Sequence, residues 1–456
     1  MKTINIIISI IFFFSSLFLI IFLCSCKTKN KTANYKKIEH PDWSKNASIY
    51  EVNIRQYTPE GTFNAFAEHL PRLKEMGIDI LWLMPIHPIG IENRKGTLGS
   101  YYSVKDYFDV NPEFGTKDDF QNLVNKTHEL GMYVIIDWVA NHSSWDTEQI
   151  RNNSDWYTKN QNGEIISPVD DWSDVADFNY DNPEMRDFMI DALKYWVTDF
   201  NIDGYRCDVA AMVPTDFWNL VRFELDKIKP VFMLAEANEP ILHKYAFDMT
   251  YAWDTHNLLN EIAQGKKGVS DLVKLLKSEK SKYPKNAYHM NFTSNHDENT
   301  WKGTEYERMG KAVKTFAVLS FTIPGMPLIY SGQESCMDKR LRFFDKDTII
   351  WQNDCEISEL YTTLLKLKKE NKALWNGEYG GTLIRIATTA DNKIFAFKRE
   401  NDENEIITLV NLSSEKVSFS IKENLVIDTY SEVFTNQSLL LVNSLESWGY
   451  LVYKKN

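Results

Sequence analysis

The segment DGYRCDVAA, residues 203–211, places a guanidinium and a carboxylate in what reads as a buried strand. Strand side chains alternate between two faces, so Arg206 and Asp208 point to one face while Tyr205 and Cys207 point to the other. A structural ion pair is one interpretation, although desolvating two charges can cost as much as their attraction returns. The other interpretation is chemical, because a neighbouring cation lowers the pKa of a carboxyl group and would keep Asp208 ionised for reaction.

Polar residues also follow the apolar runs at residues 133–139, 231–237 and 288–294. Each has an ordinary explanation by itself, as a loop, a helix cap or a satisfied polar contact. Together with Arg206 and Asp208 they would gather four carboxylates, two histidines and an arginine at the ends of neighbouring strands, where barrel enzymes hold their active sites. The residues are Asp137, Asn141, His142, Glu236, Asn295, His296 and Asp297.

Eight short apolar runs alternate with amphipathic stretches from residue 48 onward, which is typical of repeated βα units. The simplest closure is a (β/α)8 TIM barrel. Between the first two runs, Phe63, Phe66, Leu70, Leu73 and Met76 recur at helical spacing and predict a core-facing helix. Further helices are expected at residues 184–200, 215–228 and 308–321. The predicted strands are 48–57, 79–86, 133–139, 204–209, 231–237, 246–251, 288–294 and 327–332.

Composition changes divide the chain further. Residues 141–182 are rich in Asn, Asp, Ser and Trp and predict a short inserted lobe after the third strand, so the barrel would comprise residues 46–140 and 183–374. Residues 375–456 predict a C-terminal antiparallel β-sandwich domain. Its expected strands are 381–388, 393–400, 405–412, 416–421, 438–442 and 448–454.

Bulk composition limits the classes of function. With 43% hydrophobic and 25% charged residues, the 456-residue chain is typical of a globular protein. A net charge of −12 argues against nucleic-acid binding, which needs clustered Lys and Arg, and is compatible with an uncharged substrate. Most of the 13% aromatic residues are expected in the core, and a few exposed rings would suit stacking on sugars.

The N-terminus has the pattern of a targeting segment. After Lys2, residues 4–26 are almost entirely apolar and are followed by a polar stretch, which is typical of a signal peptide. The residues Leu-Cys-Ser-Cys at 23–26 resemble a bacterial lipobox, in which cleavage precedes a cysteine that becomes lipidated. They predict a lipoprotein signal segment at residues 1–26 with lipid attachment at Cys26. An uncleaved transmembrane anchor is the alternative. Both predict a protein tethered to the cell envelope and facing outside the cytoplasm, with residues 27–45 as a linker.

Cysteine usage gives little further information. Five cysteines include two in the N-terminal segment, which leaves Cys207, Cys336 and Cys355. We expect no disulfide framework from three residues, and no CxxC or Cys/His cluster suggests zinc.

Four motifs resemble the sequence regions of the α-amylase family, glycoside hydrolase family 13. In order along the chain they are DWVANH, GYRCDVAA, AEAN and SNHD, on the third, fourth, fifth and seventh predicted strands. The likeness extends to IYEVNIRQYTPEGTF, SYYSVKDYFDVNPEFGT and VADFNYDNP, and so covers about residues 45–335. The resemblance implies a barrel glycosidase that cleaves α-glucosidic bonds.

The same resemblance implies roles for individual residues. Asp208 would be the nucleophile, Glu236 the general acid/base and Asp297 a third carboxylate that holds sugar hydroxyls. A retaining glycosidase needs one ionised and one protonated carboxyl group about 5–5.5 Å apart, and crowding with burial would raise the pKa of Glu236. The residues implied to bind the sugar are Tyr102, by stacking, and His142, Arg206 and His296.

The resemblance alone also indicates a metal site and the type of glucosidic bond that is cleaved. Asn141 and Asp177 match positions that hold a structural calcium in many relatives, and oxygen ligands suit Ca²⁺. No organic cofactor is implied. The chain departs from the family pattern at Ala211 and Met212, where a Lys-His pair is usual, and Val209 is a type often seen in relatives that cut α-1,6 bonds.

We therefore expect an α-amylase-type hydrolase acting on starch, maltodextrin or malto-oligosaccharides. An oligo-1,6-glucosidase, a cyclomaltodextrinase-like enzyme, an exo-acting α-glucosidase or a transglycosylase would use the same site. A non-catalytic glucan-binding protein is the alternative of another class. It has no need of a nucleophile paired with an acid.

Overall fold

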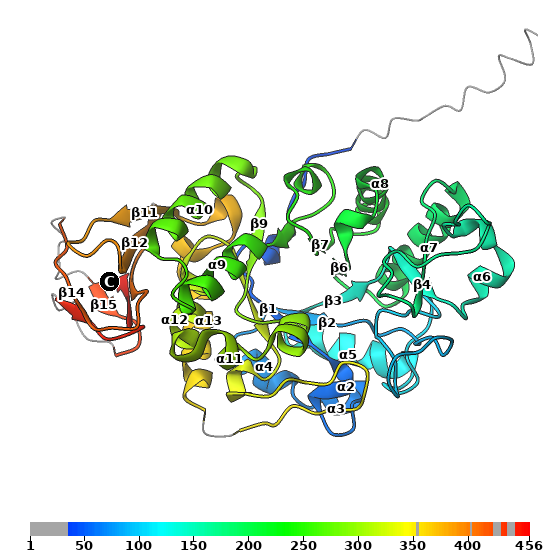
Figure 1. Cartoon of the computed structure of the whole chain (residues 1–456), viewed down its shortest axis with the longest axis horizontal. Coiled ribbons are helices and arrows are strands. Elements are labelled where there is room, and N and C mark those ends of the chain that lie inside the picture. The colour runs from blue at the N-terminus through cyan, green and yellow to red at the C-terminus, as the bar shows by residue number, and fades with distance from the viewer. Residues whose placement is uncertain (1–34, 353–354, 402–403, 423–429, 436–442) are drawn as a thin grey trace, which may run out of the picture. The chain divides into compact units, whose positions relative to one another are not determined.

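The eight predicted barrel strands form one closed parallel sheet in the order β1-β10-β9-β8-β7-β6-β3-β2 (Figure 1). The computed structural model describes residues 35–352, 355–401, 404–422, 430–435 and 443–456. Residues 37–456 form one unit. The barrel strands are β1 (Ile49–Val52), β2 (Ile80–Leu83), β3 (Tyr133–Trp138), β6 (Gly204–Cys207), β7 (Phe232–Ala235), β8 (Met249–Tyr251), β9 (Tyr288–Asn291) and β10 (Met326–Tyr330). The predicted TIM-barrel fold is confirmed.

Alternate residues of each strand face the barrel interior. Ile49, Trp82 and Ile135 belong to the inner apolar cluster, whereas Tyr205 and Cys207 belong to the larger cluster that includes residues of the surrounding helices. This alternation is the one predicted for residues 203–211. It sends Arg206 and Asp208 to the opposite face from Tyr205 and Cys207, toward the inside of the sheet.

Helices surround the barrel close to the predicted places, except that the helix predicted at 308–321 is interrupted at Gly310–Ala312. The stripe from Phe63 to Met76 is buried throughout, but it forms two helices, since Pro71 begins a second one within its first turn. The barrel helices are α2 (Ile54–Tyr57), α3 (Phe63–Ala67), α4 (Leu70–Met76), α5 (Lys117–Glu129), α7 (Pro183–Asp199), α8 (Thr215–Leu225), α9 (Trp253–Ala263), α10 (Val269–Lys282), α11 (Glu305–Met309), α12 (Val313–Thr322) and α13 (Glu356–Glu370).

The first predicted strand, 48–57, is too long. Strand β1 ends at Val52, and Ile54–Tyr57 forms α2 instead. The amides of Gln56 and Tyr57 both bond the carbonyl oxygen of Asn53, which turns the chain. Because every residue of both elements is buried, the sequence shows no periodicity that separates helix from strand there.

The segment between β3 and α7 contains a small two-stranded sheet and a short helix. These elements are β4 (His142–Ser144), α6 (Glu148–Asn152) and β5 (Val175–Asp177). The two strands pair in antiparallel fashion, with His142 opposite Asp177. The pairing holds the start of the segment, directly after β3, against its end.

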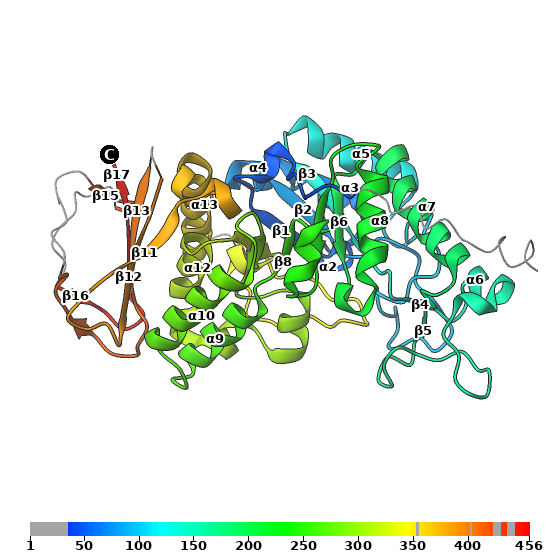
Figure 2. The same ribbon diagram turned by 90° about the horizontal axis from the view of Figure 1, so that it is seen from above.

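The C-terminal residues form a separate antiparallel sheet, as predicted, in the order β11-β12-β13-β17-β15, with a second sheet of β14 and β16. Helices α12 and α13 lie between this sheet and the barrel strands (Figure 2). The predicted strand 438–442 lies outside the described residues, and β15 was not predicted. The strands are β11 (Thr382–Ile386), β12 (Ile394–Glu400), β13 (Glu405–Asn411), β14 (Val417–Ser418), β15 (Tyr430–Glu432), β16 (Ser444–Leu445) and β17 (Tyr450–Lys455).

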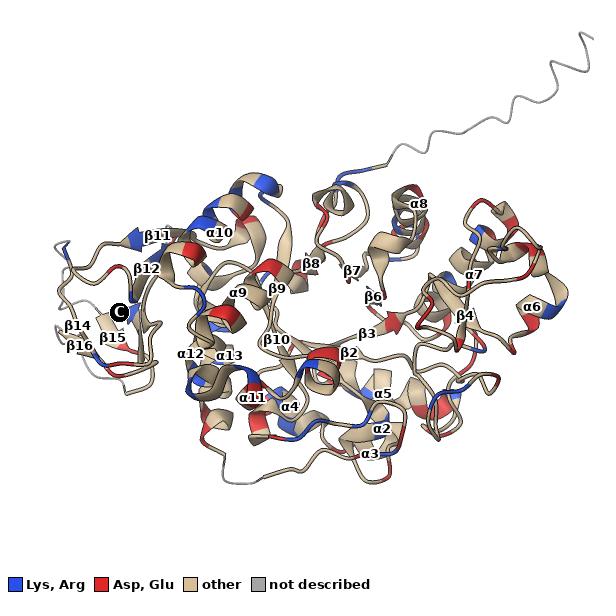
Figure 3. Ribbon diagram, in the orientation of Figure 1, with Lys and Arg blue, Asp and Glu red and all other residues tan. Residues whose placement is uncertain are grey.

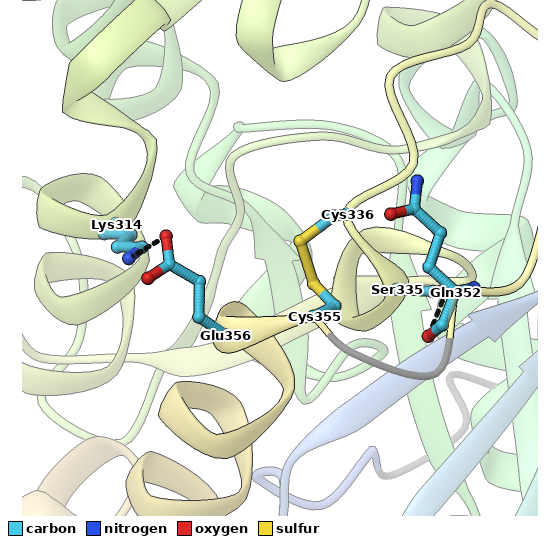
Figure 4. Close-up of a disulfide and its surroundings, with 6 residues drawn as sticks. All are labelled: Lys314, Ser335, Cys336, Gln352, Cys355 and Glu356. Carbon is cyan, nitrogen blue, oxygen red and sulfur yellow. Dashed lines mark hydrogen bonds and ion pairs between the residues drawn. A yellow bond between two sulfur atoms is a disulfide. The ribbon is translucent and has the colours of Figure 1, made fainter.

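A disulfide joins Cys336 and Cys355, whose Cα atoms are 5.8 Å apart (Figure 4). The cysteine count indicated no disulfide framework, so this single bridge is a correction. The two residues are separated by 19 positions, and they meet because the loop after β10 folds back to the start of α13. The spacing of the two cysteines in the sequence does not predict that this loop folds back to α13. Among the described residues, Cys207 is a free cysteine, and it is buried.

Charged residues of both signs are interspersed along the elements (Figure 3). Helix α10, for example, carries Asp271 and Glu279 among its lysines. None of the helices in the described part of the chain is long and apolar enough to cross a membrane. The predicted signal segment with Cys26, and residues 27–34 of the predicted linker, lie outside the described residues.

Candidate active site

Arg206 on β6 is fully buried, and three carboxylates converge on its guanidinium. Its Nη1 donates to Asp137 Oδ1 and to Asp208 Oδ1, at 2.9 Å each. Its Nη2 lies 3.0 Å from Glu236 Oε2 in an ion pair. The remaining nitrogen, Nε, donates to the hydroxyl of Tyr251 at 3.1 Å. One cation therefore holds acids from three neighbouring strand ends.

The register of the sheet explains this convergence. Asp137 on β3 and Arg206 on β6 are direct partners in the parallel ladder, and Arg206 is paired on its other side with Leu234 of β7. Glu236 follows Leu234 by two residues and so points to the same face. The amide of Glu236 donates to Cys207 O at 3.0 Å, which continues the ladder beyond β7. The acids thus lie at the C-terminal ends of the barrel strands.

Burial and mutual repulsion decide how these acids titrate. Burial raises the pKa of Asp208 well above its ordinary value, the charge of Glu236 adds to this, and Arg206 opposes both. The expectation that Arg206 favours the ionised form is therefore right in direction, but burial outweighs it. Burial likewise raises the pKa of Asp137 to about 6. The charge of Glu236 therefore acts with burial to favour the neutral form of Asp208, and Arg206 favours the ionised form.

The residue after Asp208 has an unusual backbone. Val209 adopts φ 36° and ψ 47°, a left-handed conformation that is rare and strained for a β-branched residue. This turn directs its N–H to Glu236 Oε2 at 2.8 Å. The Val209 N–H therefore donates to the same oxygen of Glu236 with which the Arg206 guanidinium forms its ion pair. A proton on Glu236 belongs on the other oxygen, Oε1.

A second charged group lies at the end of β9. His296 contacts Glu51 of β1 through Nδ1, and Asp297 Oδ2 at 3.3 Å through Nε2. Burial opposes a charge on His296, but Asp297 and Glu51 together raise its pKa well above the ordinary value. Burial also opposes the charge of Asp297, yet His296 outweighs it and lowers the pKa of Asp297 to about 2. Asp297 is therefore ionised and His296 protonated at neutral pH.

Two aromatic groups complete the site at the positions predicted for sugar contacts. The hydroxyl of Tyr102 donates to Asp137 Oδ2 at 3.0 Å and lies 2.8 Å from His296 Nε2. His142 on β4 lies against the backbone of Tyr102, and burial lowers its pKa to about 3, so its ring is neutral. The ring of Trp172 lies 5.5 Å from that of His142. The two site histidines thus carry different charges.

The geometry corresponds to a known family. The profile described as alpha amylase, catalytic domain, matches residues 28–267 and 243–373. The chain belongs to the α-amylase family. It is a glycoside hydrolase, as the resemblance implied.

Solved structures extend this α-amylase-family likeness over nearly the whole chain. An α-amylase from Lactobacillus plantarum is 31% identical, with a TM-score of 0.81, and the match covers 91% of this chain and 100% of that one. A maltogenic α-amylase from Thermotoga neapolitana is also 31% identical, with a TM-score of 0.80, covering 90% and 96%. The maltogenic alpha-amylase of Bacillus acidopullulyticus is 28% identical over an alignment of 440 residues, which covers 90% of this chain and 72% of that protein.

The calcium predicted for this α-amylase-family chain finds few ligands. Ca²⁺ takes six to eight oxygen ligands, usually with several carboxylates. Asn141 places its amide nitrogen 3.3 Å from the ring of His142. Burial raises the pKa of Asp177, which favours its neutral form. No group of three or more His, Cys, Asp or Glu side chains in the described residues could hold a metal ion. Calcium at Asn141 and Asp177 stays a prediction, and no step of the mechanism uses it.

Sequence reasoning missed two residues of the α-amylase-family site. Glu51 is fully buried and follows Ile49 by two positions, so strand alternation could have found it as it found Arg206. Trp301 donates its indole N–H to Asp297 Oδ1 at 3.1 Å. It follows Asp297 by four residues in the π-helix Glu298–Lys302, and no sequence signal distinguishes that turn from an ordinary helix.

Proposed function

We propose that this chain is a retaining hydrolase of α-glucosidic bonds in starch, maltodextrin or malto-oligosaccharides. The observation that carries the proposal is the pairing of Asp208 and Glu236 on one guanidinium. A glucan-binding protein has no need of two carboxylates held in this way. The names of the relatives, which include α-amylase and maltogenic α-amylase, support the substrate class.

In the first half of the reaction, the ionised form of Asp208, which Arg206 favours against the effect of burial, attacks the anomeric carbon. The bond from that carbon to the glycosidic oxygen breaks, and Glu236 gives its proton from Oε1 to the departing oxygen. The product is a glycosyl ester of Asp208. Val209 N–H and Arg206 remain on Glu236 Oε2 and stabilise the carboxylate that forms there.

In the second half, water attacks the same carbon. Glu236 now takes a proton from the water, the ester bond to Asp208 breaks, and the sugar leaves with its original anomeric configuration. Ionised Asp297 is suited to accept hydrogen bonds from sugar hydroxyls, because His296 keeps its pKa at about 2. Protonated His296 can then donate a hydrogen bond to the sugar, and neutral His142 can either donate or accept one.

Transfer to a second sugar competes with hydrolysis at the ester. After Asp208, this chain presents Ala211 and Met212, both exposed, and Met212 is 45% exposed. Ala211, which stands in place of the usual lysine, offers a leaving sugar no charged donor, and the thioether of Met212 beside it is apolar. We infer weak binding on the leaving-group side, which favours departure of the first product and entry of water.

The mechanism is tested by following product anomers by ¹H NMR during hydrolysis of maltoheptaose. We expect the α-anomer first, with mutarotation later, and loss of turnover by at least about 10³-fold in Asp208→Asn and Glu236→Gln. Asp191→Asn, which changes an exposed acid on α7, is the control and keeps full activity. Initial release of the β-anomer, or equal turnover in all variants, would refute the mechanism.

Product analysis decides between the related activities. Chromatography of products from maltoheptaose, isomaltose and a cyclodextrin separates endo from exo action and α-1,4 from α-1,6 cleavage. We expect α-1,4 products of several lengths from maltoheptaose. Exclusive release of glucose from isomaltose would instead support the oligo-1,6-glucosidase, and preference for the cyclodextrin would support the cyclomaltodextrinase-like enzyme.

We also propose that the protein is anchored in the cell envelope by a lipid on Cys26, outside the cytoplasm. The bridge between Cys336 and Cys355 supports this compartment, because disulfides persist in oxidising surroundings. Incorporation of labelled palmitate into the full chain tests the proposal. We expect labelling to disappear in Cys26→Ala and to persist in Cys24→Ala. Labelling of both variants, or of neither variant, would exclude Cys26 as the attachment site.

A further inference from the structure

Trp301 is a large side chain beside the catalytic acids that the proposed mechanism does not use. It is 51% exposed, although tryptophan is highly buried on average. Its indole N–H is committed to Asp297 Oδ1 at 3.1 Å, so the ring has a fixed orientation next to that carboxylate. It belongs to a single turn of π-helix, a feature that is frequent at functional sites.

Two phenylalanines support the indole from the protein side. The ring centroid of Trp301 lies 5.4 Å from that of Phe343 and 5.8 Å from that of Phe344. Phe343 in turn stacks with Tyr102 at 6.2 Å and an interplanar angle of 11°. Tyr102, Phe343 and Trp301 therefore form one aromatic surface that starts at the site and ends at an exposed ring.

The loop that carries Phe343 and Phe344 is held firmly. It is closed by the disulfide between Cys336 and Cys355 (Figure 4). It is also bonded to the π-helix, since Leu341 N donates to Asn299 Oδ1 at 2.9 Å and Thr300 Oγ1 donates to Leu341 O at 3.0 Å. The aromatic surface is thus preorganised, which lowers the entropy cost of binding a ligand on it.

We propose that Trp301 stacks on a glucose unit of the substrate, on the non-reducing side of the unit held at Asp297. The proposal rests on the proposed α-glucan hydrolysis. A pyranose ring presents C–H groups on its faces, and an exposed indole with its N–H already bonded offers a matching apolar surface.

The position of Glu236 argues for the non-reducing side. Glu236 must reach the departing oxygen, so the leaving part of the glucan passes this acid, which is held by Val209 and Arg206. Trp301 is attached to the other acid, Asp297, and to the aromatic surface that begins at Tyr102. The unit that meets the indole therefore belongs to the part of the glucan that becomes bound to Asp208.

Two glycosyl fluorides test this assignment with the full chain in detergent. α-Glucosyl fluoride supplies only the reacting unit, whereas α-maltosyl fluoride adds one unit on the non-reducing side. Fluoride release gives kcat/KM for each. We expect Trp301→Ala to lower kcat/KM for α-maltosyl fluoride about tenfold, equivalent to about 1.4 kcal/mol, and to change that for α-glucosyl fluoride less than about twofold.

Two further variants separate stacking from other effects of the substitution. Trp301→Phe keeps an aromatic face but loses the N–H bond to Asp297, and we expect it to retain at least half of the wild-type preference for α-maltosyl fluoride. Ile350→Ala removes another exposed side chain, 58% exposed, from the same loop, and leaves both substrates unaffected.

Each outcome bears on one proposal only. An equal loss on both fluorides in Trp301→Ala, or a Trp301→Phe variant as poor as Trp301→Ala, would show that Trp301 acts only through Asp297 and would overturn the stacking. No loss on either fluoride would overturn it as well. If the wild-type chain releases no fluoride and no sugar from maltoheptaose, the proposed hydrolysis fails instead, independently of Trp301.

Discussion

Replacing Arg206 by glutamine removes the cation that forms ion pairs with Asp137, Asp208 and Glu236. Asp208 loses a charged hydrogen bond of 2.9 Å from Nη1, and bonds of this kind contribute about 1.5–3 kcal/mol each. One pKa unit corresponds to about 1.36 kcal/mol, so the pKa of Asp208 should rise by roughly 1–2 units. The sign is clear, because Arg206 lowers this pKa against the effect of burial.

The pH dependence of kcat/KM measures this shift, since its acid limb reports the essential base of the free enzyme. In Arg206→Gln, we expect the acid limb to move up by about 1–2 pH units, and activity below the shifted limb to fall about 10- to 100-fold from protonation of Asp208 alone. Raising the pH should recover this part of the loss. Any remaining deficit comes from the lost contacts to Asp137 and Glu236.

A second buried arginine supplies the control. Arg399 is 1% exposed, but its guanidinium donates to carbonyl oxygens of Gly381, Ile323 and Trp375. Arg399→Gln should therefore lower thermal stability without moving the acid limb. The reasoning fails if the limb of Arg206→Gln stays at the wild-type pH, or if Arg399→Gln shifts it equally.

Three further predictions follow from other parts of the structure. Removing the bridge by Cys336→Ser with Cys355→Ser should lower the free energy of unfolding by about 3 kcal/mol, the loop entropy for a separation of 19 residues; dithiothreitol should lower the Tm of the wild type only. In Glu51→Gln, NMR titration should show a lower pKa for His296, because Glu51 helps to raise it. Stability that comes from a raised histidine pKa is lost as the pH rises through that pKa. The Tm of Glu51→Gln should therefore begin to fall at a lower pH than the Tm of the wild type. EDTA should leave Tm and activity unchanged; a drop restored by calcium would show that the predicted calcium site exists.

Strand periodicity predicted the parts of the site that lie on regular strands. Alternation placed Arg206 and Asp208 on one face of their strand, and the same rule would have placed Glu51 on the same face as Ile49. Trp301 could not be predicted, because its contact with Asp297 depends on a π-turn that sequence does not distinguish from a helix. The bridge from Cys336 to Cys355 depends on how a long loop returns to α13, which is tertiary information.

The charge arrangement explains why the buried positions 206 and 208 carry charged side chains rather than apolar ones. Five buried or partly buried acids, namely Glu51, Asp137, Asp208, Glu236 and Asp297, surround two cations, Arg206 and His296. Such a cluster is poor for stability, since desolvation is costly and the acids outnumber the cations. It is suited to holding protons near neutral pH, because repulsion and burial raise the pKa of Asp137 and Asp208 while His296 keeps Asp297 ionised. The attacking carboxyl group must be ionised, and Arg206 favours that form of Asp208 against the effect of burial.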